Sequence, residues 1–398
     1  MILPSLRNQD YTHKKVLVRV DLNVPMEKGE VTDISRFLAI KETVDYLIKQ
    51  NAQVVLLSHF GRPKSTSKPA EWDSKFSLKS LAEPLSAVLS CPVHFIKHYK
   101  GLNVLESLKL VPSGAVLLLE NVRFDPGEEC NDLSFAKDLS QGFDFFVNEA
   151  FSCSHRAHAS VEGITNFLPS LAGINLEREI TYLAQCLTNP MRPLAAIIGG
   201  SKVSTKLDLL VNLSQKVDHL IIGGAMANTF LAAKGYSIGQ SLYEPHLISV
   251  AEKILKESSS TLLLPVDGVV ACSLESTESH SVKFSEEEAI EGKIFDIGTN
   301  SITKIKDIVR KANTVVWNGP LGAFEYPSFS LGTLEIAKIL AQLTQDGILT
   351  VAGGGDTLAA LEMAKVKDRL TYASTAGGAF LEWLEGKKLP GVEALLKR

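Results

Sequence analysis

The chain has 398 residues, and at about 150 residues per domain this length predicts two or three domains. Hydrophobic residues make up 45% and charged residues 22%, values typical of globular proteins, which argues against long disorder or a fibre. Lys and Arg number 41 against 45 Asp and Glu, and a net charge of −4 argues against a basic nucleic-acid-binding protein. We therefore expect no nucleic-acid partner.

The N-terminal residues read MILPSLRNQD, in which we expect neither a signal peptide nor a membrane anchor. No apolar run approaches the roughly 18 residues of a membrane span. The five cysteines are widely spaced and form no CxxC pair or Cys/His cluster, which disfavours structural zinc and a disulfide framework. These features predict a reduced, cytoplasmic protein with no membrane partner.

Short β-rich apolar runs alternate with longer amphipathic stretches from end to end, a pattern typical of βαβ units and parallel sheets. The predicted strands of the first half are Lys15–Val20, Gln53–Ser58, Ala115–Leu119 and Asp144–Val147. Those of the second half are Leu194–Ile198, His219–Ile222, Thr261–Leu264, Thr314–Trp317 and Ile348–Ala352. A helix is predicted over Leu176–Leu187, before the helix-breaking TNPMRP, and we place the domain boundary near it.

In the first half, polar and charged residues follow the strands, where ligands of open α/β sheets bind. The segments read RVDLNVP, SHFGRP, LENVRF and VNEAFSCSHRAHAS, and the residues they offer, with one on the first crossover, are Asp21, Asn23, His59, Arg62, Arg123, His155, Arg156, His158 and Arg36. A single Arg there is more often a solvated helix-end residue, and a single His a hydrogen-bonded structural one. Several cationic groups at one edge instead predict a small, multiply charged anion.

In the second half, glycines follow the strands, in IIGGSKVSTKL, IIGGAMANTFL, VVWNGPLGAFE, TVAGGGDTLAAL and ASTAGGAFLEWL. Glycines between a strand and a helix let the backbone approach a ligand, and the helix N-terminus attracts phosphate. One such turn can serve helix–strand packing alone, but five predict a nucleotide site. Lys202 and Lys206, one helical turn apart, can reach phosphates together. Asp356 suits a carboxylate ligand of Mg²⁺, a helix N-cap, or both.

Several common motifs are missing: the sequence holds no GxxxxGK[ST], HRDxxxxN, HExxH or GxSxG. P-loop ATPase, protein kinase, zinc protease and α/β-hydrolase functions are therefore disfavoured. A Rossmann dehydrogenase would place GxGxxG after the first strand, where Asp21-Leu22-Asn23-Val24-Pro25 stands instead.

Taken together, these segments resemble the phosphoglycerate kinase family over nearly the whole chain. The motifs, in the family's order and spacing, are RVDLNVP (19–25), SHFGRP (58–63), LENVRF (119–124), HRAHAS (155–160), GGSKVSTK (199–206), WNGPLGAFE (317–325), GGGDT (353–357) and LEGKKLPGV (384–392). The resemblance implies an α/β fold of two similar-sized, Rossmann-like three-layer αβα domains with parallel sheets, joined by an interdomain helix and hinge. It implies a phosphoglycerate-binding domain over 1–173, a helix and linker over 174–190, a nucleotide-binding domain over 191–380, and a segment over 381–398 that returns to the N-terminal domain.

The resemblance also implies the ligands and their residues. Those expected to hold 3-phosphoglycerate or 1,3-bisphosphoglycerate are Asp21, Asn23, Arg36, His59, Arg62, Arg123 and Arg156. Those expected at ADP or ATP are Lys202, Lys206, Asn318, Glu325, Gly354, Gly355, Asp356 and Thr357, with Mg²⁺ on Asp356. Arg36, Lys202 and the amides of Gly355 and Gly378 are expected to surround the transferring phosphoryl group. A monomer is the family's expectation.

The chain departs from the family pattern in a few places. Glu149-Ala-Phe-Ser-Cys-Ser154 replaces Asp-Ala-Phe-Gly-Thr-Ala, Ala376 replaces a glycine, Phe380 replaces a smaller residue, and a proline is missing from Asp296-Ile-Gly-Thr299. None of these changes removes a charged catalytic group. The implied activity is Mg-dependent, in-line phosphoryl transfer from 1,3-bisphosphoglycerate to ADP after hinge closure, with no general base. A bilobal binding protein and a different acyl-phosphate-forming kinase are the competing hypotheses.

Overall fold

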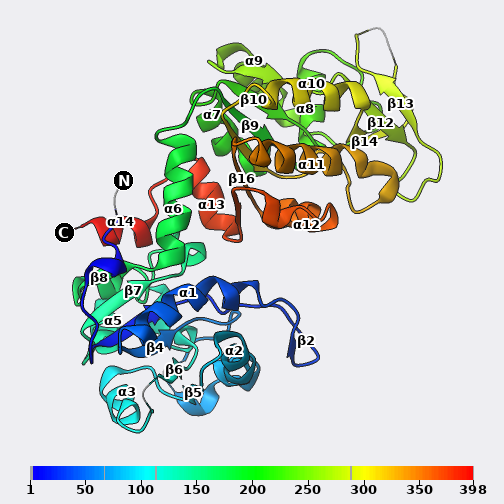
Figure 1. The fold of residues 1–398 in the computed structure, drawn as a ribbon. Helices are drawn as coiled ribbons and strands as arrows, with labels where there is room; N and C mark the ends of the chain where they lie inside the picture. Colours follow the sequence, from blue (N-terminus) through cyan, green and yellow to red (C-terminus); the bar gives the residue numbers. More distant parts are fainter. Residues whose placement is uncertain (1–2, 67, 113, 287–288, 398) are drawn as a thin grey trace. The chain divides into compact units, whose positions relative to one another are not determined.

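The computed structural model describes residues 3–66, 68–112, 114–286 and 289–397. The chain divides into two compact units, unit 1 (Met1–Thr181 with Lys388–Arg398) and unit 2 (Tyr182–Lys387). The boundary falls inside helix α6 (Ile174–Leu187), drawn in green in Figure 1. The finer four-part division made from the sequence stays a prediction. Among the described residues, no helix is both long enough and apolar enough to cross a membrane.

Unit 1 is built on a six-stranded sheet in the order β5-β6-β4-β1-β7-β8. Its strands are β1 (Lys15–Arg19), β4 (Gln53–Leu57), β5 (Val93–Ile96), β6 (Val116–Leu119), β7 (Phe145–Asn148) and β8 (Ser170–Ala172). Every pairing is parallel, and β1 lies between β4 and β7, with Val16 opposite Val54 and Phe145. The strand order therefore changes direction between β1 and β7, which makes this edge the switch point of the sheet.

Alternate residues of these strands enter two separate cores, as the period of two in a strand requires. Val16 and Val18 pack in one core, whereas Leu17 enters the other. The helices of unit 1 are α1 (Ser35–Lys49), α2 (Ala82–Leu89), α3 (Gly101–Leu108), α4 (Pro126–Glu129), α5 (Leu133–Ser140) and α14 (Pro390–Leu396). Helices α1 and α2 contribute to the first core and α3 and α5 to the second, which gives three layers. A small hairpin of β2 (Met26–Glu27) and β3 (Glu30–Val31) precedes α1.

A buried carboxylate fixes the start of α6. Glu149, just after β7, is 4% exposed and accepts hydrogen bonds from the N–H groups of Asn175 (3.1 Å) and Leu176 (3.0 Å). Thr43 of α1 donates its hydroxyl to the same carboxylate and accepts the N–H of Ile174 at 2.8 Å. The first N–H groups of a helix have no partner inside it, and here three of them are satisfied by side chains from α1 and from the residue after β7.

Unit 2 is built on a second parallel sheet in the order β11-β10-β9-β15-β16-β17. Its strands are β9 (Leu194–Ile198), β10 (His219–Ile222), β11 (Thr261–Leu263), β15 (Thr314–Asn318), β16 (Leu349–Gly353) and β17 (Tyr372–Ser374). In chain order this is the doubly wound arrangement 3-2-1-4-5-6, with its switch point between β9 and β15. Ala195 pairs with His219 on one side and Val315 on the other.

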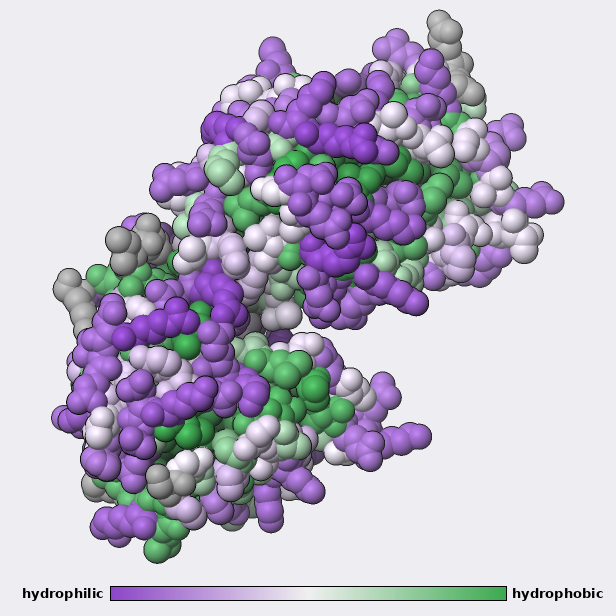
Figure 2. Space-filling model, viewed as in Figure 1, coloured by the Kyte–Doolittle hydropathy of each residue, from purple (hydrophilic) through white to green (hydrophobic). Residues whose placement is uncertain are grey.

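The helices of unit 2 are α7 (Leu207–Ser214), α8 (Met226–Ala233), α9 (Ile248–Glu257), α10 (Thr299–Val309), α11 (Leu331–Gln345), α12 (Gly355–Met363) and α13 (Gly377–Leu384). Helices α10, α11 and α12 share one core with the sheet. An antiparallel sheet in the order β13-β12-β14 adds β12 (Asp267–Ala271), β13 (His280–Lys283) and β14 (Lys293–Ile297). Hydrophilic residues cover most of the visible face of both units, as expected when helices cover both faces of a sheet (Figure 2).

The structure confirms the predicted fold class of two parallel-sheet α/β domains. Each of the nine predicted strands matches an observed one to within one residue at either end. The predictions did not include β5, β8 and β17 at the sheet edges, the β2–β3 hairpin or the antiparallel sheet. These strands are short or carry polar residues, so their pattern differs little from that of a loop.

Candidate functional site

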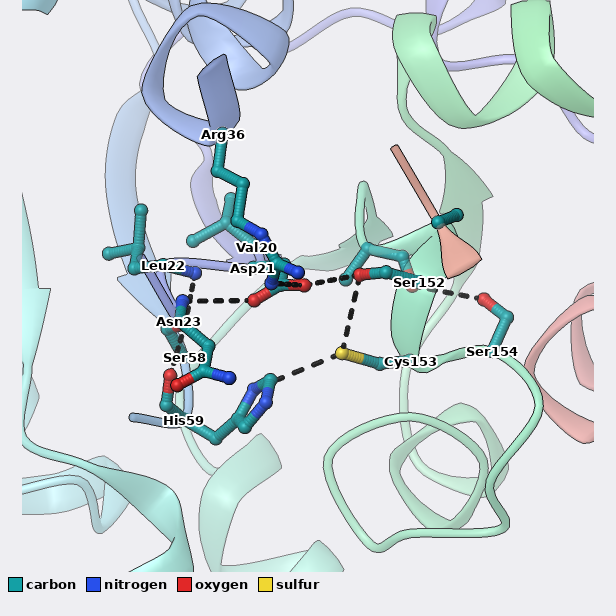
Figure 3. A network of polar contacts seen from close by, with 12 residues as sticks. Val20, Asp21, Leu22, Asn23, Arg36, Ser58, His59, Ser152, Cys153 and Ser154 are labelled. Carbon is teal, nitrogen blue, oxygen red and sulfur yellow. Dashed lines mark hydrogen bonds and ion pairs between the residues drawn. The ribbon is translucent and has the colours of Figure 1, made fainter. Parts of the chain in front are cut away.

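The switch point of unit 1 brings three polar side chains from distant segments into contact (Figure 3). Asp21, two residues after the end of β1, forms an ion pair with Arg36 on the first turn of α1 and accepts a hydrogen bond from the hydroxyl of Ser152, which follows β7. Asp21 is 9% exposed, and the N–H of Asn23 donates to its other oxygen at 2.9 Å. The carboxylate thus fixes Arg36 at the edge where a ligand of this fold class binds.

The electrostatic surroundings keep Asp21 ionised. Burial raises the pKa of this carboxyl, but the neighbouring His59, the positive charge of Arg36 and the hydrogen bonds from Ser152 and Asn23 lower the pKa by more, to well below its usual range. The carboxylate is therefore charged throughout the physiological range. It can hold the Arg36 guanidinium in place before any substrate arrives.

A buried arginine lies beneath this cluster. Arg19, the last residue of β1, is 1% exposed and donates to His59 Nδ1 at 3.2 Å and to Ser160 Oγ at 2.8 Å. Ser160 in turn donates to Glu128 Oε1 at 2.6 Å, so a fully buried carboxylate lies near the arginine. Burial and the charge of Arg19 lower the pKa of His59 well below its ordinary value, which leaves the ring neutral at pH 7.

Gly61, in the segment after β4, connects the segments after β1 and β6 through its backbone N–H and carbonyl groups. Its N–H donates to Asn23 Oδ1 at 2.8 Å, and its carbonyl accepts from Arg123 Nη1 at 2.7 Å. Arg123 is 5% exposed, and its Nε lies 3.2 Å from Glu129 Oε1. The segments after β1, β4 and β6 are therefore tied into one surface.

The other residues of unit 1 that were predicted at the anion site are more accessible to solvent. Arg62 is exposed next to Gly61, whereas Arg156 is half-buried and its Nε donates to His155 Nε2 at 3.1 Å. Burial, and then Arg19, lower the pKa of His158 to about 4, so this histidine adds no charge at pH 7. The positive charge offered to a ligand here belongs to arginines.

At the switch point of unit 2, a lysine joins the two strand ends. Lys206 Nζ donates to the carbonyl of Gly199 after β9 (2.6 Å) and to Asn318 at the end of β15, through Oδ1 (2.6 Å) and the carbonyl oxygen (3.3 Å). Burial lowers the pKa of this ammonium to about 8, although Asp356 raises it. In the absence of a ligand its donors are used within the protein. Lys202 is exposed in the same loop, and the two lysines are separated by a bend and a 3-10 turn rather than by a turn of α-helix.

Two glycines at this switch point have conformations and surroundings that exclude a side chain. Gly319 has φ +92°, and a Cβ there would lie 2.3 Å from the carbonyl oxygen of Gly199. Gly354 has φ +101°, and a Cβ there would lie 2.7 Å from Asn318 Nδ2, which donates to the carbonyl of Gly353 at 2.7 Å. Thr357 Oγ1 accepts the Gly319 N–H at 2.7 Å. The turns after β15 and β16 are therefore joined by hydrogen bonds, and their glycines leave the backbone at these two positions uncovered by a side chain of their own.

Beside these turns unit 2 holds a cavity of about 660 Å³. Glu325 and Asp356 line it, together with apolar residues that include Leu231, Phe284 and Leu321. An apolar cavity with a few polar groups at one end is typical of a small-ligand site, and this size suits a nucleotide base and ribose. Gly355 and Gly378 are exposed in the first turns of α12 and α13, where N–H groups lack helical partners.

The groups around Asp356 fit a magnesium ion bound to phosphates. Its carboxylate is exposed in the first turn of α12, beside the glycine turns that leave room for phosphate. Oxygen ligands of this kind suit Mg²⁺, which usually keeps one or two protein carboxylates and takes its other ligands from phosphates and water.

The chain was compared with known proteins. A sequence profile described as "Phosphoglycerate kinase" matches residues 6–387. This chain belongs to the phosphoglycerate kinase family. The phosphoglycerate kinase of Bartonella quintana is 48% identical over 395 residues (98% of both chains), and that of a Chelativorans species 49% over 396 residues (98% of both).

Solved phosphoglycerate kinases share the fold. The structure from Coxiella burnetii matches with a TM-score of 0.90 at 40% identity, covering 100% of this chain and 99% of that one. The structure from Pyrococcus horikoshii OT3 matches with a TM-score of 0.81 at 31% identity, covering 100% and 98%. Membership of this family makes the chain an enzyme of the class that transfers phosphoryl groups to a carboxyl group, EC 2.7.2.3.

Some residues that shape the two switch points of this phosphoglycerate kinase family member were absent from the sequence predictions. The signal for Arg19 in the sequence is a charged residue within an apolar strand. A buried charge is costly unless it has partners, so such a residue indicates a network of polar contacts. Ser152 was noted only as a departure from the family pattern, yet it contacts Asp21. Asp296 lines the cavity and accepts the N–H of Gly332 in α11 at 2.7 Å, a long-range contact that no motif signals.

Proposed function

We propose that this chain catalyses the reversible transfer of a phosphoryl group from 1,3-bisphosphoglycerate to ADP, giving 3-phosphoglycerate and ATP in glycolysis and gluconeogenesis. The observation that carries this proposal is the complementary chemistry of the two switch points. One presents a buried carboxylate–guanidinium cluster that suits a small anion, and the other presents glycine turns beside an apolar cavity that suits a nucleotide.

In unit 1, the arginines bind phosphoglycerate through its phosphate and carboxylate, because a planar guanidinium matches both groups in a bidentate manner. Arg62, Arg123 and Arg156 act on the anion, and Asp21 orients Arg36. Asn23 positions Gly61 and Arg123 through the backbone. His59, neutral beside Arg19, contributes hydrogen bonds rather than charge.

In unit 2, the base and ribose occupy the apolar cavity, with Glu325 near the ribose. The phosphates lie against the turns of Gly354, Gly355 and Thr357, with Lys206 and Asn318 behind them. Bound through Asp356, Mg²⁺ would neutralise phosphate charge and hold the nucleotide's phosphates in one geometry.

The reacting groups need positioning and charge stabilisation more than proton transfer. The attacking oxygen belongs to the β-phosphate of ADP in one direction and to a carboxylate in the other, and both are ionised at pH 7. Arg36, Lys202 and the amides of Gly355 and Gly378 stabilise the in-line transition state. Because these groups come from both units, we propose that transfer takes place in a closed state, with the hinge at α6.

A coupled assay of ATP formation from 1,3-bisphosphoglycerate and ADP tests the proposal. We expect turnover that chelation of Mg²⁺ abolishes and that excess Mg²⁺ restores. Ligand binding without ATP formation would instead support a binding protein. ATP formation only from another acyl phosphate would support a different kinase.

A further inference from the structure

The fold of unit 1 brings together three side chains of the kind that bind soft metal ions. Asp21, His59 and Cys153 follow three different strands and are all buried, and one ligand atom of each lies within 4.8 Å of the other two. Figure 3 shows the thiol of Cys153 directed toward the imidazole of His59, with the Asp21 carboxylate beside them. The spacing of cysteines in the sequence gave no sign of such a cluster.

We propose that Asp21, His59 and Cys153 bind a single zinc-like divalent cation, and that this cation and phosphoglycerate exclude each other. The first part rests on the cluster alone, and the second part rests on the proposed function. Thiolate, imidazole and carboxylate are the three protein ligands of Zn²⁺. Mg²⁺ prefers oxygen ligands in an octahedral arrangement, so this cluster selects against the ion proposed at Asp356.

The distances are close to those of a tetrahedral site. With zinc bonds of about 2.0 to 2.3 Å, the edges of a tetrahedron measure roughly 3.3 to 3.8 Å. Cys153 Sγ lies 3.8 Å from His59 Nδ1 and 3.8 Å from Ser152 Oγ. The Asp21 oxygen, within 4.8 Å of both other ligand atoms, needs to approach by about 1.5 Å at most. Ser152 Oγ or a water molecule can complete the four ligands.

The tautomer of His59 already suits a metal. Because Arg19 donates to Nδ1, this nitrogen carries no proton, and the lone pair that accepts from Arg19 is the one that a cation would take. Arg19 keeps its hydrogen bonds to Ser160 and to the carbonyl of Val20 when Nδ1 turns to the cation. The arginine therefore stays paired.

The cation must displace the Arg19 N–H from His59, the Arg36 guanidinium from Asp21, and the proton of Cys153. Arg36 pairs with Asp21 through a side chain that is 30% exposed, so Arg36 can move outward into solvent. The Cys153 thiol loses its proton to solvent as the sulfur–metal bond forms, which releases one proton per cation. Arg19, Arg36 and Arg123 oppose the cation's charge, so binding is weaker than at a structural zinc site.

Exclusion of phosphoglycerate follows from the residues that the cation occupies. Asp21 and His59 both belong to the surface assigned to phosphoglycerate, and a cation held between them takes up the groups that this surface offers to the substrate. The cation and phosphoglycerate therefore compete for the same side chains.

Co²⁺ titration of the metal-free protein tests the site, because a thiolate bound to Co²⁺ gives a near-ultraviolet charge-transfer absorption. Cys91, Cys130 and Cys272 are half-buried or exposed, so all variants carry serine at these positions. We expect one equivalent of Co²⁺ to give the band, Zn²⁺ to abolish it by displacement, and Mg²⁺ to leave it unchanged. Calorimetry in buffers of different ionisation enthalpy should show one proton released.

The matched control is Cys153→Thr, which restores the residue of the family pattern. This variant should lose the band and bind Zn²⁺ at least tenfold more weakly, while its turnover without Zn²⁺ and its thermal unfolding stay those of the parent. His59→Gln should also weaken Zn²⁺ binding at least tenfold. A full band in Cys153→Thr, or equal Zn²⁺ affinity in both variants and the parent, would overturn the site.

Adding 3-phosphoglycerate separates the two parts of the proposal. We expect it to reduce the cobalt band and raise the apparent Kd for Zn²⁺. If the band requires Cys153 but does not respond to 3-phosphoglycerate, the metal site is upheld and mutual exclusion is refuted. ATP formation measured with no Zn²⁺ present tests the proposed function separately from both results.

Discussion

The two switch points present different chemical groups to a ligand. In unit 1 a network of charged side chains, with Arg19, Asp21 and Arg36 at its centre, is fixed before binding. In unit 2 the corresponding edge is made of backbone, glycine turns and a single anchored ammonium on Lys206. A small anion offers only charge and shape, so its site needs fixed guanidinium groups. A nucleotide also offers a large apolar surface, so backbone amides and a cavity can hold it.

The two sheets have different strand orders at their edges but the same strand order around the switch point. Counted in chain order, the sheet of unit 1 runs 3-4-2-1-5-6 and that of unit 2 runs 3-2-1-4-5-6. In both sheets the first strand lies at the centre, with the second strand on one side and a later strand on the other. The outer strands can therefore be rearranged without changing where the ligand edge forms.

The largest expected effect comes from residues assigned to the transition state in both units. Arg36→Ala and Lys202→Ala should each lower kcat at least a hundredfold, because removing an arginine from a phosphoryl transition state costs on the order of 10³ to 10⁵ in rate. Calorimetric Kd values for 3-phosphoglycerate and Mg-ADP should change only a few-fold. Steady-state kinetics beside calorimetry measures this division.

Arg36→Lys is the matched control, and it should recover little activity because an ammonium lacks the planar fork. Near-normal kcat in Arg36→Ala, with the whole defect in Kd for 3-phosphoglycerate, would show that this residue only binds substrate. Unit 1 would then contribute substrate binding through Arg36, and no transition-state stabilisation by this residue.

The next prediction concerns the carboxylate of unit 2. Gly354 rather than Asp356 is the N-cap residue of α12, so Asp356→Asn leaves the helix cap unchanged and removes only the charge assigned to Mg²⁺. Turnover should therefore fall, and the Mg²⁺ requirement should rise about tenfold. Thermal unfolding should stay close to that of the parent because Asp356 is exposed. An unchanged Mg²⁺ titration would refute the assignment of Mg²⁺ to Asp356.

Within unit 1, replacing either of two arginines on the same surface should weaken binding of 3-phosphoglycerate to a similar extent, but only one of the replacements should destabilise the protein. Arg62→Ala and Arg123→Ala should each raise the KM for 3-phosphoglycerate about 10- to 100-fold, since a charged hydrogen bond is worth about 1.5 to 3 kcal/mol. Only Arg123→Ala should also lower the melting temperature, because Arg123 is buried and bonded to Gly61. An unchanged KM in both variants would refute the assignment of this surface.

Local sequence features predicted much of the architecture, because the central strands are continuous apolar runs and their ends carry recognisable motifs. The pairing of Lys206 with Asn318 could not be predicted, since it joins residues 112 positions apart through atoms whose direction only the fold sets. The same holds for Ser152 on Asp21 and Cys153 beside His59. Sequence patterns show which residues follow a strand, and the sheet order decides which strand ends become neighbours.

Each unit has a buried carboxyl group at a helix N-terminus, and comparing the two groups compares the two units directly. Replacing either group should have the smallest effect on turnover. Burial raises the pKa of Glu149 at α6 to about 7 and that of Asp296 beside α11 to about 7, despite the backbone hydrogen bonds that each accepts. A raised pKa means that the folded state binds the proton more tightly than the unfolded state. Each carboxyl therefore removes stability as pH rises from its unfolded value, about 4 to 4.5, to about 7, by no more than about 3 to 4 kcal/mol.

Glu149→Gln and Asp296→Asn remove this titration from one unit at a time. In urea unfolding at pH 5 and pH 8, the loss of stability between the two pH values should be smaller in each variant than in the parent. His59 and His158 have lowered pKa values and oppose the trend, but they are common to all three proteins and cancel in the comparison. If both variants lose as much stability as the parent, then their carboxyls are ionised in the folded state at pH 5, where their hydrogen bonds outweigh burial. If only Asp296→Asn responds, the Thr43 and backbone donors have stabilised the Glu149 anion, and α6 begins on a carboxylate whose charge is constant above pH 5.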